Sequence, residues 1–263
     1  MRILIVEDQP EIRAYLAETL SNEWRVIEAA DGQQGLQRAR QDQPDMILSD
    51  VMMPGLDGFQ MLARLRDDLA TSHIPVLLLT ARHDRDSRMK GLTLSADEFL
   101  GKPFEIAELR LRLQRMRDNR RRMQRYLMDR GALPEAAPDA GRMPDLSARD
   151  QALLESLNDW LGQVLDQVEV TVEDMASAVA METRTLQRKL RALTGQTPSE
   201  FIRHYRLQRA IELLLGSDRS VHDIALSCGF SSPQSFSRTF SREYGQPPDR
   251  WRRNRGPADQ RAD

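Results

Sequence analysis

The stretch that decides the fold runs from Met46 to Gly58 and has the sequence MILSDVMMPGLDG. An apolar run opens it, Ser49 and Asp50 follow, and turn residues come next. A continuous apolar run bounded by turn residues is typical of a strand that is buried on both faces of a parallel sheet. Asp50 is therefore expected at the carboxyl end of this strand, where open α/β sheets bind their ligands. A carboxylate there can be a metal ligand, a nucleophile or a helix cap.

Short apolar runs alternate with helical patterns on both sides of this stretch. The expected strands are Arg2–Val6, Trp24–Ala29, Met46–Asp50, Val76–Leu79 and Asp97–Leu100. The expected helices begin at Pro10, Gly32, Phe59, Asp84 and Glu105, and the third and fourth end at Leu69 and Leu94. Strands that alternate with helices in this way predict an α/β domain with a doubly wound, five-stranded parallel sheet.

Charged and hydroxyl-bearing residues stand where four of these strands end, namely Glu7, Asp8, Asp50, Thr80 and Lys102. Parallel strands end at one edge of the sheet, so these side chains are expected together. Three close carboxylates repel one another unless a divalent cation is bound, and an all-oxygen set favours Mg²⁺. A lysine and a hydroxyl complete a pocket for a phosphoryl group.

Asp50 follows the most buried strand and is the best candidate for a nucleophile that attacks phosphorus and becomes an acyl phosphate. Taken alone, an aspartate at a strand end is more simply explained as a cap or turn former. A Lys-Pro pair such as Lys102-Pro103 is, taken alone, more simply a turn. The prediction depends on all of these residues standing at matching strand ends.

The segments ILIVEDQPEIRAYL, ILSDVMMPGLDGFQML, IPVLLLTAR and ADEFLGKPF resemble the receiver domain of two-component response regulators, which has a flavodoxin-like fold. The resemblance covers residues 1–120. It implies that Asp50 accepts phosphate from a sensor histidine kinase. It also implies that Asp8, Asp50 and the backbone carbonyl of Met52 bind Mg²⁺ directly, with Glu7 acting through water.

The same resemblance assigns parts to three residues farther along the chain. Lys102 would pair with the phosphoryl group, and the Lys102–Pro103 bond would be cis. Thr80 would move toward the phosphoryl oxygen on activation, and Phe99 would swing inward with it. Ser95 and Gly101 depart from the common pattern of the family, but neither takes part in the expected chemistry.

Length and composition limit the possible classes of protein. A chain of 263 residues with 30% charged and 40% hydrophobic residues is long enough for two globular domains. No apolar run approaches the ~20 residues that span a bilayer, and Glu7-Asp8 follows the apolar start too soon for a signal peptide. We therefore expect a cytoplasmic protein without a membrane segment. A single cysteine, Cys228, excludes an internal disulfide or a cysteine-cluster metal site.

The net charge of -2 conceals an asymmetry along the chain. The segment from Thr183 to Arg255 has fourteen Lys and Arg residues against six Asp and Glu residues, a local charge of +8. The remainder of the chain carries -10. A basic carboxyl region behind an acidic amino region favours an anion-binding module such as a nucleic-acid-binding domain, or simply a solvated surface.

The helix from Glu105 is expected to continue to Arg130, with apolar residues at helical spacing: Leu109, Leu113, Met116, Met123 and Leu127. This pattern fits either a coiled-coil-like extension that pairs with another subunit or the last helix of the first domain packed on its own sheet. Gly131 to Pro144 contains three prolines and is expected to be a linker. We therefore assign residues 121–146 to a helical extension and linker. A further helix opens after it at Leu146-Ser147.

Two helix-turn-helix patterns follow in an all-α carboxyl domain, expected over residues 147–255, with a disordered tail over 256–263. The first pattern joins Val172–Val179 to Thr183–Thr194, and the second joins Val221–Cys228 to Pro233–Tyr244. A longer helix, Pro198–Leu215, lies between them. Two units joined rigidly would present their second helices to successive major grooves of DNA, ~34 Å apart.

The second helix of each unit has an apolar face and a polar face. The polar faces carry Arg184, Gln187, Arg188 and Arg191 in the first unit, and Gln234, Ser235, Arg238 and Arg242 in the second. Arginine pairs with guanine and glutamine with adenine, whereas arginines elsewhere on the surface suit phosphates. A helical bundle with solvated arginines is the alternative.

The segments TLQRKLRALTGQTPSEFIRHYRLQRAIELL and IALSCGFSSPQSFSRTFSREYGQPPDRWR resemble the AraC/XylS-type DNA-binding domain. The resemblance implies base contacts by Arg184, Gln187 and Arg188 in the first unit, and by Gln234, Ser235 and Arg238 in the second. Pro233 departs from the family at the start of its helix, which makes the contact by Gln234 the least secure. A reactive thiol is not expected at Cys228.

Together the two resemblances predict a transcription factor rather than an enzyme, in which phosphorylation of Asp50 controls binding to double-stranded DNA, through a homodimer. RNA polymerase is a further candidate partner. One alternative is a phosphate-storing shuttle whose output region binds protein. Another is a phosphatase that uses Asp50 as nucleophile; such enzymes usually carry an aspartate two residues later, where this chain has Met52.

Overall fold

The computed structural model describes residues 1–81, 97–130 and 146–255. The predicted helix Asp84–Leu94, the predicted linker Gly131–Pro144 and the predicted tail 256–263 lie outside the described residues. The chain divides into two compact units. The first contains Met1–Tyr126, and the second contains Leu153–Arg191 and Gln196 onward.

The first unit is built on a sheet of five parallel strands in the order β2-β1-β3-β4-β5. The strands are β1 (Arg2–Val6), β2 (Arg25–Ala29), β3 (Met46–Asp50), β4 (Val76–Ala81) and β5 (Glu98–Lys102). This confirms the predicted doubly wound α/β sheet. β5 begins one residue later than expected and extends to Lys102, while β4 continues to Ala81.

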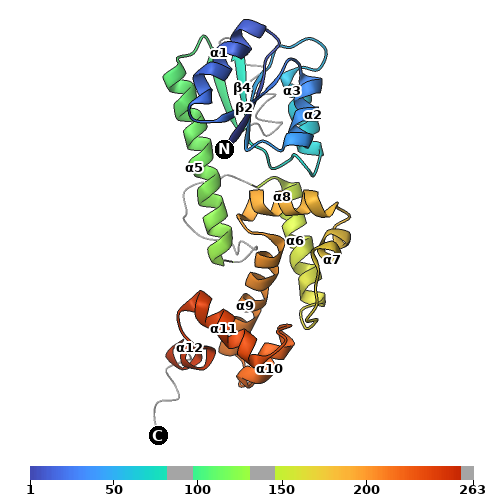
Figure 1. The fold of residues 1–263 in the computed structure, drawn as a ribbon, viewed down its shortest axis with the longest axis vertical. Coiled ribbons are helices and arrows are strands. Elements are labelled where there is room, and N and C mark those ends of the chain that lie inside the picture. The colour runs from blue at the N-terminus through green and yellow to red at the C-terminus, as the bar shows by residue number, and fades with distance from the viewer. Residues whose placement is uncertain (82–96, 131–145, 256–263) are drawn as a thin grey trace. The chain divides into compact units, whose positions relative to one another are not determined.

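Helices cover both faces of the sheet, as Figure 1 shows. On one face lie α1 (Pro10–Ser21) and α5 (Ile106–Arg130), and on the other lie α2 (Gly32–Asp42) and α3 (Gly58–Asp67). The five residues of β3 are all buried, so successive side chains supply both cores. Ile47 packs on the α2–α3 side, whereas Met46 and Leu48 pack on the α1–α5 side. Full burial of one such side chain contributes roughly 1.5–3 kcal/mol.

Helix α3 is shorter than its apolar pattern suggests. Asp57 caps its amino end through a capping box with Gln60. The helix ends at Asp67, because Asp68 has an extended backbone and its carboxylate accepts a hydrogen bond from the backbone N–H of Ala70. Asp68 also pairs with Arg40 of α2 at 2.6 Å. The prediction of a helix to Leu69 was wrong because these local polar contacts stop the helix first.

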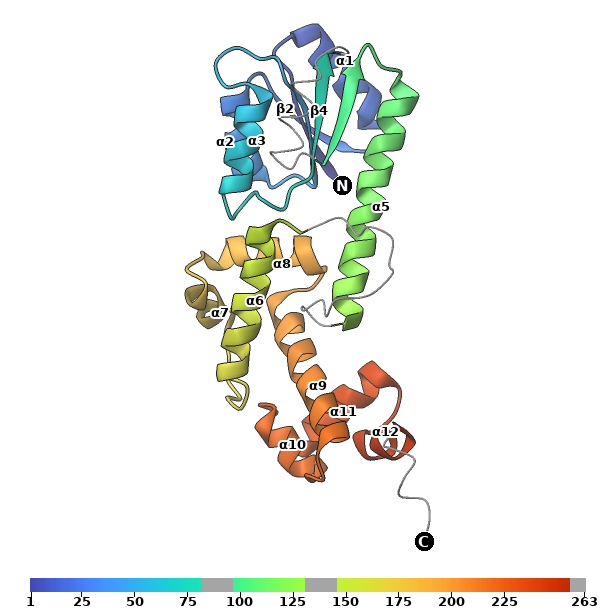
Figure 2. The same ribbon diagram turned by 180° about the vertical axis from the view of Figure 1, so that it is seen from behind.

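The second unit is helical, which confirms the all-α prediction. Its helices are α6 (Ala148–Gln163), α7 (Val172–Ala178), α8 (Thr183–Thr194), α9 (Pro198–Gly216), α10 (Val221–Ser227), α11 (Pro233–Tyr244) and α12 (Pro248–Arg255). The long helix α9 runs between the α7–α8 pair and the group formed by α10, α11 and α12 (Figure 2). Both predicted helix-turn-helix patterns are therefore present.

Helix α12 is not expected from the sequence, and it completes the core around α11. Phe236 and Phe240 of α11 are fully buried. The ring of Trp251 from α12 lies 5.8 Å from that of Phe240, edge to face, and 6.5 Å from that of Tyr244. Aromatic pairs at this geometry contribute about 0.5–1.5 kcal/mol beyond the area that they bury. These contacts fix the back of α11 and leave its other face to solvent.

Candidate phosphoacceptor site and nucleic-acid interface

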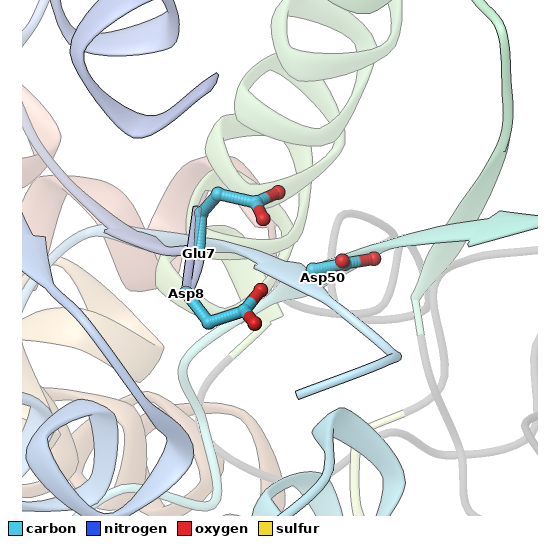
Figure 3. A group of neighbouring side chains, drawn as sticks. All are labelled: Glu7, Asp8 and Asp50. Carbon is cyan, nitrogen blue, oxygen red and sulfur yellow. The ribbon is translucent and has the colours of Figure 1, made fainter. Parts of the chain in front are cut away.

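Three carboxylates meet at the carboxyl edge of the sheet. Glu7 and Asp8 directly follow β1, and Asp50 ends β3, which pairs with β1 in parallel. One carboxylate oxygen from each of the three lies within 4.8 Å of the others. Figure 3 shows the three side chains as neighbours at this edge of the sheet. Glu7 is completely buried and Asp50 is 5% exposed, so water screens their repulsion poorly.

Lys102, at the end of β5, bridges two of these carboxylates. Its Nζ lies 3.1 Å from Oε2 of Glu7 and 3.0 Å from Oδ2 of Asp50. Burial opposes the charged form of Lys102, but the hydrogen bonds and attraction to Asp50 and Glu7 outweigh burial and raise its pKa. Burial also raises the pKa of Glu7, and the nearby Asp50 charge adds to this, although the hydrogen bond from Lys102 acts the other way.

The charges of the site are not fully compensated by Lys102. Within the described part of the chain, Oδ1 of Asp8 is buried and has no hydrogen-bond partner. A buried anionic oxygen without a partner is costly, so an unsatisfied oxygen beside two further carboxylates fits a site for a divalent cation. Oxygen ligands are those that Mg²⁺ prefers. The donor set therefore fits the ion that the sequence predicts.

Arg13 positions the two acidic residues that follow β1, and the sequence analysis missed it. From α1, its Nη1 donates to the backbone carbonyl of Glu7 at 2.7 Å and to that of Asp8 at 3.5 Å. Its Nε lies 3.5 Å from a carboxylate oxygen of Glu28 on β2. Arginine at this spacing carries no recognisable sequence signal, because its acceptors are main-chain carbonyls.

Gly58 holds the loop after Asp50 close to the strand. A Cβ at this position would lie 2.4 Å from the backbone carbonyl oxygen of Asp50, so only glycine fits. The N–H of Gly58 donates to the carbonyl of Val51 at 2.9 Å, and the N–H of Val51 donates to Oδ1 of Asp50 at 2.9 Å. These contacts fix the Asp50 side chain and the turn beyond it.

The remaining predicted site residues of the first compact unit lie at or near the carboxyl edge of the sheet. Thr80 is buried on β4 and is paired with Gly101, the residue before Lys102. Phe99 is half-buried and packs against the core on the α2–α3 side. The side chain of Met52 is 71% exposed, which leaves its backbone as the part that can face the site. The Lys102–Pro103 peptide bond is cis, as predicted.

The predicted recognition helices present the expected faces. In α8, Leu186, Leu190 and Leu193 are buried, while Arg184 and Gln187 are exposed and Arg188 is half-buried. In α11, Gln234 and Arg238 are exposed and Ser235 is half-buried. The exposed residues are of the types that read base edges in the major groove.

Pro233 does not disturb the start of α11. It occupies the first helical turn, where its missing N–H costs nothing, and the side chain of Ser232 accepts a hydrogen bond from the N–H of Ser235.

Among the described residues, no helix is long and apolar enough to cross a membrane.

Comparison with protein families identifies both parts of the chain. The model of the response regulator receiver domain matches residues 3–114, and that of a helix-turn-helix domain matches residues 175–254. The two matches together give the architecture of a DNA-binding regulator.

Individual relatives are similar over one or both parts. "Histidine kinase P4" of Formosa agariphila is 32% identical over 249 residues, which are 95% of this chain and 18% of that protein. "Transcriptional activator protein PfeR" of Pseudomonas aeruginosa is 36% identical over 62% of this chain and 55% of that protein. "Transcriptional activator protein IrlR" of Burkholderia pseudomallei is 45% identical over 43% of this chain and 49% of that protein.

The chain thus spans less than two thirds of the length of each of these relatives. Its two matched regions contain, in order, the acidic edge of a parallel sheet and a pair of helix-turn-helix units. The chain therefore joins an amino-terminal response regulator receiver domain to a carboxyl-terminal helix-turn-helix domain of the AraC type.

Proposed function

We propose that phosphorylation of Asp50 by a sensor histidine kinase controls sequence-specific binding of this protein to double-stranded DNA, and thereby transcription. The observation that carries the proposal is the cluster of Glu7, Asp8, Asp50 and Lys102 at one sheet edge. The cluster combines an oxygen donor set that fits a metal ion, a carboxylate that can serve as the nucleophile and a cation, in a chain that also carries two helix-turn-helix units.

Asp8, Asp50 and the backbone carbonyl of Met52 would bind Mg²⁺, with Glu7 acting through water. The bound ion would neutralise charge on the phosphoryl oxygens during transfer. The chain's own part is to hold the ligands in place. Arg13 fixes the Glu7–Asp8 backbone, and Gly58 allows the loop after Asp50 to approach the strand.

In the transfer step, an oxygen of the Asp50 carboxylate attacks the phosphorus of the donor. A new O–P bond forms, and the P–N bond to the kinase histidine breaks with its electron pair left on nitrogen. The Asp50 carboxylate thereby loses its own charge. The Lys102 ammonium then pairs with the phosphoryl oxygens in place of the carboxylate.

Thr80 and Phe99 would transmit the change to the surface. Thr80 lies on β4 beside Gly101, the residue that precedes Lys102, and this position supports a hydrogen bond from its hydroxyl to a phosphoryl oxygen. Phe99 is half-buried and neighbours Leu78 across the β4–β5 pair, so it can follow that movement. The surface formed by the predicted helix Asp84–Leu94, β5 and α5 would change shape and dimerise. Dimerisation raises the apparent affinity for paired sites through effective concentration.

DNA contact is assigned to the exposed faces of α8 and α11. Bases would be read from α8, in the first helix-turn-helix unit, by Arg184, Gln187 and Arg188. They would be read from α11, in the second helix-turn-helix unit, by Gln234, Ser235 and Arg238. RNA polymerase is a further proposed partner, and we place the protein in the cytoplasm. The domain limits 1–120, 121–146 and 147–255 belong to the same proposal.

Two experiments test the proposal. The full chain is incubated with acetyl phosphate and Mg²⁺, and the modified peptide is identified by mass spectrometry. Modification is expected at Asp50 and lost in Asp50→Ala; an unmodified protein would refute the switch. Genome-wide footprinting of wild type beside Asp50→Ala then tests the output. Identical footprints would show that DNA binding does not depend on Asp50.

A further inference from the structure

One arginine joins the turn of the second helix-turn-helix unit to the loop that precedes the first, through main-chain contacts. Arg206 lies near the middle of α9, and its Nη1 donates a hydrogen bond to the backbone carbonyl of Gly229 at 2.9 Å. Its Nη2 donates to the backbone carbonyl of Gln167. Gln167 belongs to the loop that leads from α6 into α7, whereas Gly229 forms the turn between α10 and α11. The guanidinium therefore contacts the turn of the second helix-turn-helix unit and the loop that leads into the first.

The two loops also approach each other directly. Gly229 has a φ of +71°, and a Cβ at this position would lie 2.4 Å from the backbone carbonyl oxygen of Leu165 and 2.9 Å from Cζ of Arg206. Only glycine permits such a close approach of two backbones. The turn of the second unit thus rests on the loop that precedes the first unit, with Arg206 beside the contact.

The carboxyl end of α6 also lies close to the side chain of Tyr205, the α9 residue before Arg206. A Cβ at Gly162, near the end of α6, would lie 3.2 Å from the hydroxyl oxygen of Tyr205. Helix α9 alone is a connection of 19 residues, roughly 28 Å long, that can bend and twist. A second connection across its middle restrains the rotation of one unit against the other.

The chemistry of arginine suits this place better than that of lysine. The guanidinium is planar and rigid, so two of its nitrogens can donate to two separate carbonyls at a fixed angle. Lysine offers a single ammonium on a flexible stem. Both acceptors are uncharged main-chain oxygens, so the contact fixes geometry and is not an ion pair. Burial lowers the pKa of Arg206, but an arginine stays protonated at every physiological pH.

We propose that Arg206 is a positioning residue that sets the spacing at which the two helix-turn-helix units engage DNA, by holding the α6–α7 loop against the turn between α10 and α11. The inference rests on the proposed DNA-binding function and adds to it. Without this contact α8 and α11 keep their own base contacts, but the units tolerate a different separation of the two DNA segments.

The test uses the full chain with Mg²⁺ and acetyl phosphate, and duplex DNA that the wild type selects from a random-sequence pool. Footprinting locates the two contacted segments, and one base pair is then inserted between them. The insertion moves one segment by ~3.4 Å and turns it by roughly 35°. Disturbing the base contacts of one unit should lower the affinity of the wild type at least about tenfold.

In Arg206→Lys we expect weaker binding to the selected site. We also expect the inserted base pair to lower the affinity of this variant less than about threefold, because the units adjust to the new spacing; this loss of affinity on insertion is called the insertion penalty. The matched control is Arg209→Lys, on the same helix, where the arginine is exposed and pairs with Glu212 of its own helix. This control should keep the penalty of the wild type. A general loss of stability would lower affinity for both DNAs and leave their ratio unchanged.

An insertion penalty in Arg206→Lys that equals that of the wild type would overturn the inference. So would a wild type that binds selectively but shows no penalty. If Arg206→Lys does not fold, as judged by circular dichroism, the same ratio in Arg206→Gln decides, since one amide can serve only part of the contact. A wild type that selects no DNA sequence would instead refute the proposed function, which keeps the two failures apart.

Discussion

Replacing Asp8 by asparagine should stabilise the metal-free receiver domain. The carboxylate oxygens of Glu7, Asp8 and Asp50 lie within 4.8 Å of one another, and at an effective dielectric constant of about 20 each pair at that distance repels by roughly 3.5 kcal/mol. Lys102 offsets the charges of Glu7 and Asp50, to which it is bonded. Asp8 is half-buried, so partial solvent screening reduces the expected gain in unfolding free energy to about 1–2 kcal/mol.

The assay is calorimetric unfolding of the full chain in EDTA and then in Mg²⁺. In EDTA, the transition midpoint of the receiver domain should rise by at least about 3 °C in Asp8→Asn. In Mg²⁺ at ten times its dissociation constant, the wild type should gain about 1.4 kcal/mol by mass action. The variant lacks one ligand carboxylate and should gain much less, so the difference between the two proteins should narrow.

The control is Glu18→Gln, which removes one exposed negative charge from α1 without touching the cluster. It should shift the midpoint little and leave the response to Mg²⁺ unchanged. If Asp8→Asn unfolds at or below the wild-type temperature in EDTA, the carboxylates are not in repulsive contact. The argument that the site requires a cation would then be wrong.

Three further predictions concern other parts of the chain. Gly58→Ala should lose about 1–3 kcal/mol of stability and accept phosphate more slowly, because its Cβ would meet the carbonyl of Asp50. The control Gly216→Ala has open space around it and should be neutral in both melting and phosphorylation assays. Burial raises the pKa of Cys228 to about 11, so a thiol-specific reagent at pH 8 should label it only after denaturation; rapid labelling of the native protein would contradict its burial. Arg238→Ala should cost about 1–3 kcal/mol of DNA-binding free energy and relax the sequence preference at one base pair. Arg242→Ala should instead weaken binding to all DNA sequences alike and reduce the salt dependence of binding. Equal effects of the two substitutions would refute the assignment of Arg238 to a base.

The parts of the fold with strong local patterns can be predicted to the residue. β3 is buried at all five positions, so its apolar run and the following turn residues mark it clearly. In α8 the leucines recur at helical spacing and are buried as expected. Helix α12 has no such pattern, because Trp251 is the single apolar residue in PDRWRRNR. It is stabilised by rings of α11 that only the tertiary fold brings to it.

In the candidate site too, some features follow from the sequence and others depend on the tertiary fold. Strand ends of a parallel sheet share an edge, so the meeting of Glu7, Asp8 and Asp50 could be predicted without coordinates. The sequence could not show that Lys102 bridges two of them, since that depends on side-chain rotamers. The contacts of Arg13 and Arg206 also leave no sequence pattern, because their acceptors are backbone carbonyls, which every residue carries.

The most direct test of the account compares DNA affinity with and without phosphorylation. The dissociation constant of the full chain for its selected DNA is measured at fixed salt and Mg²⁺, before and after treatment with acetyl phosphate, in wild type and Asp50→Ala. The account predicts at least about tenfold tighter binding by phosphorylated wild type, through dimerisation, and no change in the variant. Equal affinity of phosphorylated and unphosphorylated wild type would contradict it.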